Sequence, residues 1–418
     1  MIKIYELLIA CFLGILCGAI TGFVPGIHVN TAGAIVFASS TFLLEFVSIE
    51  FLCVFLTTMS IAHAMIEFVP SMLLGVPEEG TVLSILPGHK MVLEGRSKEA
   101  IRIVSIGGFG AIIVTILLLP IFAIVLPPVQ GVIKPYTWII LLVVSVYLIY
   151  KFSVDKRTLF WSGLLFILSG ILGWVMLQTP ISSGLSLMCM FTGLFGISTI
   201  LFSLNDNSSI PHQNKFYDLH LDKDMLKGIF AGGTAGAILG FLPGFGPAQG
   251  SVIAQELSGG SENDNTKNFL TSISGLNTSD TLFSLVCIYL IGNPRSGIAV
   301  YISYFIETFT VNHLLVFSFA SLIAVSMSLV LCLKLGDSFS KLMEGIDYKK
   351  MSIGVIILMI AILYIFVIIY NGPILYLTLT LLTSTGLGLL PHYVGVGKSH
   401  LMGVLILPAM IIYFTMFM

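Results

Sequence analysis

The chain has 418 residues, of which 56% are hydrophobic and only 10% are charged. Soluble globular domains carry about 25% charged residues, so this composition excludes a soluble protein. The mean hydropathy of +1.03 indicates a polytopic membrane protein instead. Continuously apolar runs such as residues 355–369 exclude a β-barrel, whose strands alternate between apolar and polar residues. A net charge of −2 leaves no basic surface for nucleic acid.

Apolar runs that could cross about 30 Å of hydrocarbon give the expected elements in chain order. The first half has seven, at about 4–24, 30–49, 51–75, 101–127, 135–151, 158–178 and 182–203. The second half has them at about 226–242, 246–257, 279–293, 296–316, 317–335, 351–371, 373–390 and 400–417. We expect residues 4–24 to be a membrane segment, not a signal peptide, because they run into a Pro-Gly break without an Ala-x-Ala-like cleavage site.

These runs predict an all-α polytopic membrane protein of about 12–15 transmembrane or re-entrant helices. The expected division is a first transmembrane repeat over residues 1–203, a cytoplasmic linker over 204–225 and a second repeat over 226–418. The six cysteines lie inside apolar stretches without a Cys-x-x-Cys pair, so we expect buried thiols and no disulfide or metal site.

Basic residues orient a membrane protein because Lys and Arg stay on the cytoplasmic side. If residues 296–335 form one traverse, fourteen crossings place sixteen of the nineteen basic residues on one face. The other face keeps only Lys3, Lys134 and Arg295. This bias predicts that both chain termini lie on the outer side of the membrane, opposite the cytoplasm.

The chain contains an internal repeat. Residues 14–26 return at residues 232–244 with eight of thirteen positions identical, at an offset of 218. A second echo at an offset of 217 matches Leu73, Gly75, Pro77 and Gly80 with Leu290, Gly292, Pro294 and Gly297. In the expected topology the two copies start on opposite faces of the membrane. Inverted repeats of this kind are typical of secondary transporters, whose substrate site lies between broken helices near the midplane.

Each copy of the repeat ends an apolar helix at a Pro-Gly pair. Proline removes a backbone donor and glycine permits unusual dihedral angles, so the helix stops there and a new helix begins. The amides at the new helix N-terminus could hold an anion. The alternative is that the glycines at four-residue spacing only pack helices closely. The predicted substrate-binding residues near the two breaks are Pro25, Gly26, His28, Asn30, Thr31, Pro243, Gly244, Gly246, Gln249 and Ser251.

Polar residues that precede or interrupt apolar runs are the candidates for ion coupling. Asn277, Ser279 and Asp280 suit a hard cation such as Na⁺; Asp280 could instead be a helix cap that faces water. Asn293 and Arg295 follow and are assigned to substrate. Glu67 and Glu307 lie in apolar runs, where a carboxyl group suggests proton coupling, with pairing or an interfacial position as the alternative. His63 precedes Glu67 by one helical turn, so the two could form a structural pair.

Enzyme signatures are missing from the sequence. It has no His-Glu-x-x-His or Gly-x-Ser-x-Gly motif, and the Gly-Lys-Ser at 397–399 lacks the earlier glycine of a P-loop. We therefore expect no catalytic residues, no metal and no cofactor, apart from Na⁺ as one candidate coupling ion.

The motifs at residues 22–26, 77–100 and 240–247 resemble the large membrane subunit of tripartite tricarboxylate transporters, especially its archaeal relatives. The resemblance covers most of the chain and implies a secondary carrier driven by an ion gradient. It also implies a small membrane subunit and an extracytoplasmic binding protein as partners; a homodimer is left open. The chain departs from the family at residues 61–67, where members commonly carry a Tyr-Gly-Gly-type stretch, and at Pro87-Gly88, where they carry Asp-Gly.

The leading hypothesis is a multi-pass carrier in the cytoplasmic membrane that moves a di- or tricarboxylate-like anion with Na⁺ or H⁺. The first alternative is a flippase for a lipid-linked phosphate such as polyprenyl phosphate, which inverted re-entrant segments would serve equally. The second is a membrane scaffold or enzyme, which would lack a solvent-filled cavity between the repeats.

Overall fold

The computed structural model describes residues 4–25, 27, 29–75, 81, 85–179, 181, 183–204, 211–214, 220–239, 247–258, 266–292, 294–344 and 347–417. Within these residues every regular element is a helix, which confirms the all-α prediction. The first half forms α1 (Ile4–Phe23), α2 (Val29–Ala38), α3 (Ser40–Leu43), α4 (Ile49–Ile66), α5 (Phe68–Leu74), α6 (Ile85–Leu93), α7 (Ser97–Ile133), η1 (Lys134–Tyr136), α8 (Thr137–Lys151), α9 (Lys156–Leu177), α10 (Ser183–Phe191), η2 (Thr192–Ile197) and α11 (Ser198–Ser203). The second half forms α12 (Lys223–Leu239), α13 (Pro247–Ser258), α14 (Thr266–Ile291), α15 (Gly297–Phe305), α16 (Val311–Met343), α17 (Tyr348–Ile369), α18 (Ile374–Val394), η3 (Lys398–Met402) and α19 (Gly403–Phe417).

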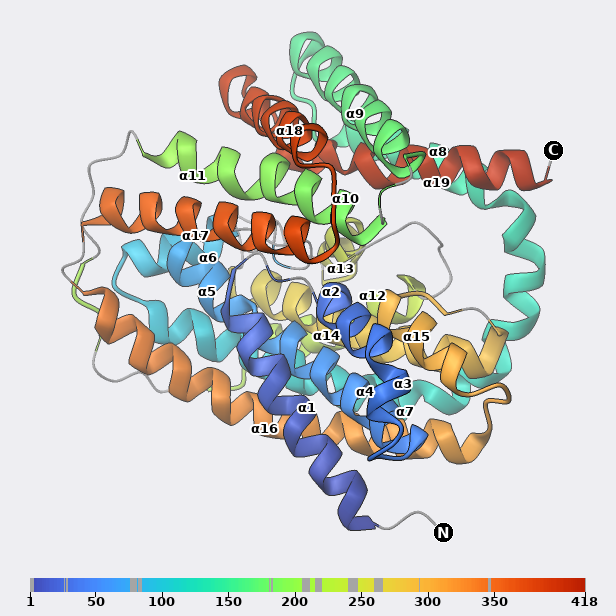
Figure 1. Ribbon diagram of the computed structural model, residues 1–418. Coiled ribbons are helices and arrows are strands. Elements are labelled where there is room, and N and C mark those ends of the chain that lie inside the picture. The colour runs from blue at the N-terminus through green and yellow to red at the C-terminus, as the bar shows by residue number, and fades with distance from the viewer. Residues whose placement is uncertain are drawn as a thin grey trace.

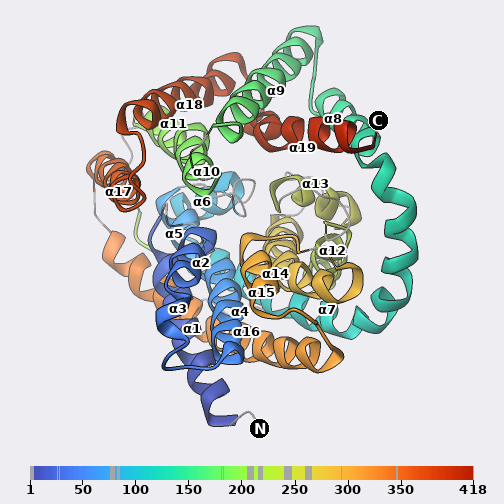
Figure 2. The same cartoon turned by 45° about the vertical axis from the view of Figure 1, so that its right-hand side comes forward.

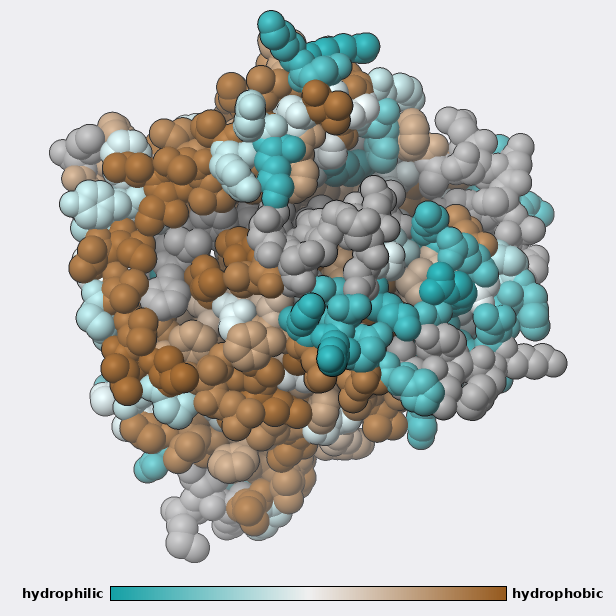
Figure 3. Space-filling model, turned by 180° about the vertical axis from the view of Figure 1, so that it is seen from behind, coloured by the Kyte–Doolittle hydropathy of each residue, from teal (hydrophilic) through white to brown (hydrophobic). Residues whose placement is uncertain are grey.

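The described residues contain nine helices that are long and apolar enough to cross a membrane. They lie at Ile4–Phe23, Ile49–Leu74, Ser97–Lys151, Lys156–Leu177, Leu185–Phe202, Val311–Met343, Lys349–Ile369, Ile374–Val394 and Lys398–Phe417. The chain is therefore a multi-pass membrane protein. Seen from behind, hydrophobic residues cover the left and lower parts of the surface, while hydrophilic residues gather on the right and at the top (Figure 3).

Three expected segments need correction. The run at 30–49 is broken into α2 and the one-turn α3, so it does not form one membrane-crossing helix. Residues 296–335 form α15 and most of α16, which are separated at 306–310 and not at 316. The segment expected at 279–293 belongs to α14, which begins at Thr266. Its polar residues hid the true start, because α14 is surrounded by protein: Thr271, Ser272 and Thr278 are fully buried.

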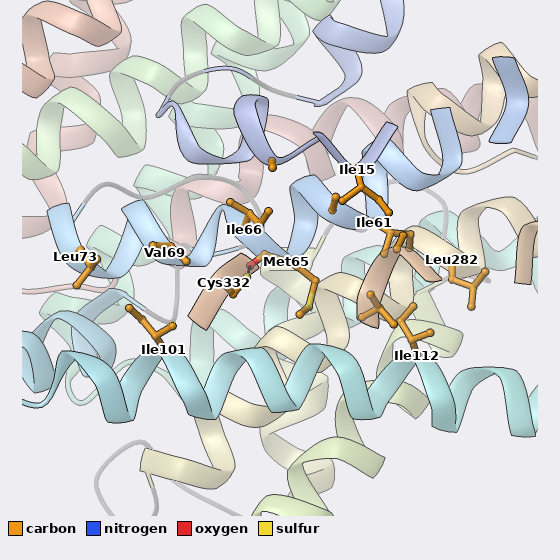
Figure 4. Close-up of a cluster of buried hydrophobic side chains, with 14 of the residues drawn as sticks. Ile15, Ile61, Met65, Ile66, Val69, Leu73, Ile101, Ile112, Leu282 and Cys332 are labelled. Carbon is orange, nitrogen blue, oxygen red and sulfur yellow. Dashed lines mark hydrogen bonds between the residues drawn. The ribbon is translucent and has the colours of Figure 1, made fainter. Parts of the chain in front are cut away.

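The helices form two bodies (Figures 1 and 2). We call α1–α7 with α12–α16 the inner body and α8–α11 with α17–α19 the outer body. The outer body has its own hydrophobic core, which includes Leu165, Phe195, Leu363 and Val404. The inner body holds the other cores, one of which runs along α4 and α5 between α1 and α7 (Figure 4). Ile200, Val355 and Met359 of the outer body join this inner core near the α16–α17 corner.

Each body therefore combines helices from both halves of the chain. The order of elements also recurs: the bounds of α2, α7 and α9 reappear about 217 residues later as those of α13, α16 and α18. Gly75 and Gly292, which are 217 residues apart, both end their helices in the left-handed conformation, with φ of 69° and 62°. This backbone conformation is costly for residues with a Cβ atom, which explains the glycine at both positions.

Glycines at four-residue spacing bring α1 against α4 in the first half and α12 against α14 in the second half. Gly14 lies against Phe55 and Thr58, and Gly22 against His63 and Glu67, so α1 and α4 run in the same direction. Gly228 lies against Asn268, and Gly236 against Ser279, so α12 and α14 also run in the same direction. The predicted close glycine packing is therefore present in both halves.

The helices α4 and α14 cross in opposite directions. At one end, Leu285 and Ile288 share a core with Cys53 and Leu56. At the other end, Phe269 and Ile273 share a core with Phe68 and Met72 of α5, which follows α4 directly. Because α1 runs in the same direction as α4, and α12 in the same direction as α14, α1 and α12 also point in opposite directions.

The segment between the halves is fixed to the inner body at residues 211–214. The Gln213 side chain is buried; its Oε1 accepts from Ser97 N at 3.1 Å and its Nε2 donates to Val92 O at 3.1 Å. The Gln213 amide donates to Glu344 Oε1, and His212 contacts the other carboxylate oxygen at 2.8 Å. These contacts hold the pKa of Glu344 below its usual range. The linker thus joins the α6–α7 turn to the end of α16.

The six cysteines are free thiols, as expected, and five of them are buried. Burial keeps these thiols inside helix contacts; Cys332 Sγ, for example, lies 3.4 Å from Met65 O.

Candidate functional site

The first Pro-Gly break separates α1 from α2, as the motif predicts. After Phe23 the chain turns, with Val24 N donating to Ile20 O at 3.2 Å and Ile27 N to Val24 O at 3.3 Å. Pro25 is buried in this turn. Gly26 and His28 lie outside the described residues, while Asn30 and Thr31 belong to the first turn of α2. We call residues 24–28 the first tip.

The second break lies between α12, which ends at Leu239, and α13, which begins at Pro247. Pro243, Gly244 and Gly246 fall outside the described residues. Gln249 lies in the first turn of α13, and Ser251 Oγ donates to Pro247 O at 2.7 Å within the same helix. With 10 and 12 residues, α2 and α13 span about 15 and 18 Å. Both are too short to cross the hydrocarbon, as expected of re-entrant helices.

The helix after the first tip packs against the second half of the chain. The Asn30 side chain lies against Gly297, and Gly33 lies against Ile298 of α15. The rings of Phe37 and Tyr301 stack with centroids 5.0 Å apart. Asn30 is therefore brought close to the connection that holds Arg295.

Four polar side chains meet where α1, α4 and α14 come together. Asn277 Nδ2 donates to Glu67 Oε1 and, at 3.1 Å, to Ala64 O. His63 Nε2 lies 3.7 Å from Glu67 Oε2, and His63 Nδ1 lies 3.1 Å from Thr21 Oγ1. All four side chains are at most 8% exposed. We call Thr21, His63, Glu67 and Asn277 the Glu67 cluster.

The Glu67 cluster joins two residues that were candidates for ion coupling, Glu67 and Asn277, across the two halves of the chain. Ser279 points elsewhere, because its Cβ lies against Gly236 of α12. Asp280 lies inside α14, so the helix-cap alternative for this residue is wrong. Glu307 is exposed in the connection between α15 and α16, which corresponds to the interfacial alternative.

Arg295 lies between α14 and α15 and connects the two bodies. Its guanidinium is close enough to interact with Cys287 of α14 and with Tyr413 of α19. Asp280, two turns before Cys287 on α14, is close enough to act electrostatically on the same thiol. Ser296 then caps α15 by accepting from Ala299 N at 3.2 Å. Asn293 lies outside the described residues.

The first tip lies where the inner body meets the outer body. Val24 and Ile27 pack against the hydrophobic core of the outer body. The helices that follow the two tips also reach it, since α2 contacts α10 and α13 contacts η3. Together with the Arg295–Tyr413 contact, these observations put both helix breaks beside one inter-body surface.

Comparisons with known proteins identify the family of the chain. Residues 8–403 match the tripartite tricarboxylate transporter TctA family. The chain belongs to the TctA family. It is also 31% identical over 408 residues to an uncharacterized protein of Methanocaldococcus jannaschii, which covers 97% of this chain and 98% of the relative. No solved structure matches the chain.

Membership in the TctA family makes this chain a subunit of a transporter and places it in the cell membrane. Tripartite systems of this kind combine the TctA subunit with a small membrane subunit and a periplasmic binding protein. TctA is a family of transporters and not of enzymes. The archaeal relative is in keeping with the archaeal-type resemblance of the motifs.

Lys398 of this TctA-family chain is a partly buried cation that the sequence pattern did not indicate. Lys398 was assigned to a cytoplasmic loop, yet its Nζ donates to Ser198 Oγ at 2.7 Å, to Thr199 Oγ1 at 2.5 Å and to Leu194 O at 3.3 Å. The last contact reaches the π-helical turn η2, whose shifted hydrogen bonding frees carbonyl groups. A single lysine between Gly397 and Ser399 gives no signal of this burial.

Proposed function

We propose that this TctA-family chain is a secondary active transporter of an organic anion of the di- or tricarboxylate class. The anion binds between the inner and outer bodies, beside the two helix breaks and Arg295. The observation that carries the proposal is the position of the first tip, whose Val24 and Ile27 flank Gly26 and contact the outer body. A substrate held there would face opposite sides of the membrane as the bodies move past each other.

The proposed alternating access rests on an inverted repeat. The offset of about 217 residues relates α1, α2 and α4 to α12, α13 and α14. The opposite directions of α4 and α14 support the inversion, because the inverted copy of a structure exchanges inward-facing and outward-facing arrangements. Transport would then require that the two tips alternate between these arrangements.

The chemistry of the site suits an anion. Arg295 supplies a cation whose planar donors match a carboxylate, and the N-terminus of α2, which includes Asn30, follows the first tip directly and favours an anion. The proposed substrate-binding residues remain those at the two breaks together with Asn293 and Arg295. Coupling to Na⁺ or H⁺ is assigned to the group of polar residues on α14, Asn277, Ser279 and Asp280, and to Glu67.

Uptake into proteoliposomes tests the proposal. The purified protein is reconstituted, and uptake of radiolabelled citrate, succinate and malate is followed with an imposed Na⁺ or pH gradient. We expect at least one of these anions to accumulate only when a gradient is present. The absence of gradient-dependent uptake of every anion would contradict the proposal, and movement of a labelled polyprenyl phosphate across the bilayer would favour the flippase alternative.

The substitution Arg295→Gln should raise the KM for the transported anion by at least about tenfold, because a hydrogen bond to a charged group contributes about 1.5–3 kcal/mol. The matched control is Lys134→Gln, which removes an exposed cation at η1. The initial uptake rate is measured against anion concentration for both variants. An unchanged KM in Arg295→Gln would exclude this residue from the binding site.

A further inference from the structure

We infer that the ion coupled to transport is a proton, and that the Glu67 carboxyl group binds it. This inference rests on the proposed function and makes it more specific, since it chooses between Na⁺ and H⁺. It is carried by the geometry of the Glu67 cluster, which joins both halves of the chain and the helix that leads into the first tip.

The atoms around the Glu67 carboxyl group favour a proton over Na⁺. Glu67 Oε1 accepts from Asn277 Nδ2, and Oε2 faces His63 Nε2 at 3.7 Å. A Na⁺ ion needs several oxygen ligands around it, whereas here nitrogen atoms occupy positions beside both carboxyl oxygens. The Asn277 N–H group that points at the carboxylate repels a metal cation but leaves room for a proton. The cluster is therefore built as a protonation site.

The Glu67 and His63 side chains are both buried. Glu67 is 6% exposed and His63 is 3% exposed. Inside a membrane protein a carboxylate without water must be compensated by a partner or neutralised by a proton. A proton from one side of the membrane adds to a carboxylate oxygen, which changes the charge of Glu67 from −1 to 0. Its release to the other side restores the carboxylate and completes the coupling without any other bond change.

Titratable groups lie on several of the described elements that pack around Glu67. On its own helix Glu67 faces His63, and α14 carries Asp280 three residues after Asn277. From α16, Cys332 bonds to Met65 O, and from α6, His89 bonds to Met72 O. The other packed helices bring Thr21 from α1 and Gly108 from α7, neither of which titrates. His63 is a titratable side chain that contacts Glu67 directly.

The Glu67 cluster contacts the end of α1, which leads into the proposed substrate site. Thr21 Oγ1 contacts His63 Nδ1 at 3.1 Å, and the backbone of Gly22 packs on His63. Both residues belong to the last turn of α1, directly before the first tip. A change of charge at Glu67 alters the hydrogen bonds of His63 and hence the support of this turn. The last turn of α1 can respond to the proton because His63 contacts both Glu67 and Thr21.

The repeat shows that the second half has no copy of this site. With the offset of 217 residues, His63 corresponds to Asp280 and Glu67 to Ser284. The two halves share their backbone arrangement but differ in the titratable groups at equivalent positions. The proposed proton site is consequently a single one, formed by the first half and closed by Asn277 of the second.

Two measurements test the inference. Infrared spectra of the purified protein are recorded during a pH titration for wild type, Glu67→Gln and the control Glu307→Gln, which alters an exposed carboxyl group. We expect one component of the protonated-carboxyl band to be present in wild type and in Glu307→Gln and to be missing in Glu67→Gln. A Glu67→Gln spectrum that keeps every component of the wild-type band would overturn the assignment to Glu67, whether or not the proposed transport function holds.

The second measurement uses proteoliposomes with radiolabelled citrate and succinate. We expect a pH gradient to drive accumulation without Na⁺, and Glu67→Gln to lose at least nine-tenths of this accumulation while it still exchanges internal for external anion. His63→Asn, which keeps a donor near Glu67, should retain part of the accumulation. Accumulation that requires Na⁺, or that survives in Glu67→Gln, would overturn the inference and leave the proposed carrier intact. Absence of all uptake would instead count against the proposed function, and the infrared titration then decides the proton site by itself.

Discussion

Replacing Gly18 with leucine should prevent α1 from packing on α4, so that little folded protein accumulates in the membrane. A Cβ atom at Gly18 would lie 2.3 Å from Met59 O and 2.8 Å from Ala62 Cβ. The first of these neighbours is backbone inside α4 and cannot move aside without displacing the helix. Overpacking of a core typically costs about 1–3 kcal/mol, and we expect a larger loss here because two helices must separate.

The matched control is Gly163→Leu, because no atom lies within 4 Å of a Cβ atom added at Gly163 in α9. The yield of monodisperse protein and its melting temperature in detergent are compared for both variants. We expect the control to resemble wild type. If Gly18→Leu gave wild-type yield and melting temperature, the close contact between α1 and α4 would be wrong.

The substitution Asn277→Leu should lower the free energy of unfolding by about 3 kcal/mol or more, since removal of one partner of a buried charged group leaves the other uncompensated. The variant loses the donor to Glu67 and the donor to Ala64 O in one step. Because Asn277 comes from α14 and Glu67 from the end of α4, the loss also weakens the contact between the two halves.

A second substitution provides the control for Asn277→Leu. Glu67→Gln removes the charge that the missing amide compensated, so the double variant should regain part of the lost stability. Melting temperatures of the two single variants and the double variant complete the cycle. Strictly additive effects of the two substitutions would mean that Asn277 and Glu67 do not interact.

Much of the fold could be predicted from the sequence because hydrophobicity and glycine spacing are local signals. The apolar runs predicted the all-α membrane fold, and the glycines at 14, 18 and 22 predicted close helix packing. The Pro-Gly pairs predicted the helix breaks after α1 and α12. These features depend on residues that are near each other in the chain, so a pattern is sufficient to detect them.

The start of α14 could not be predicted because hydropathy assumes that lipid is the solvent of a membrane helix. Residues 266–280 carry many hydroxyl and amide groups and were therefore read as a polar approach to a shorter helix. In the structure these groups are surrounded by α4, α7 and α12, and protein contacts replace lipid. Because protein and not lipid surrounds this part of α14, its side chains can be polar, and hydropathy does not detect it as a membrane helix.

The candidate site was predicted only in part, since its contacts join distant segments. The one-turn spacing of His63 and Glu67 suggested a pair, but Asn277 lies 210 residues after Glu67. Thr21 gave no signal, because a threonine in an apolar helix usually bonds to its own backbone, as it also does here with Gly18 O. The division into inner and outer bodies depends on contacts between halves that no local pattern records.

The most direct test of the account is the accessibility of residue 30 from the two sides of the membrane. Cys17, the least buried native thiol, is replaced with serine and Asn30 with cysteine, and the protein is reconstituted in vesicles. A membrane-impermeant maleimide is added outside or trapped inside, with and without citrate and a pH gradient. The account predicts that the cysteine reacts from both sides and that the gradient shifts the balance between them. Reaction from one side only, under every gradient, would contradict alternating access at the first tip.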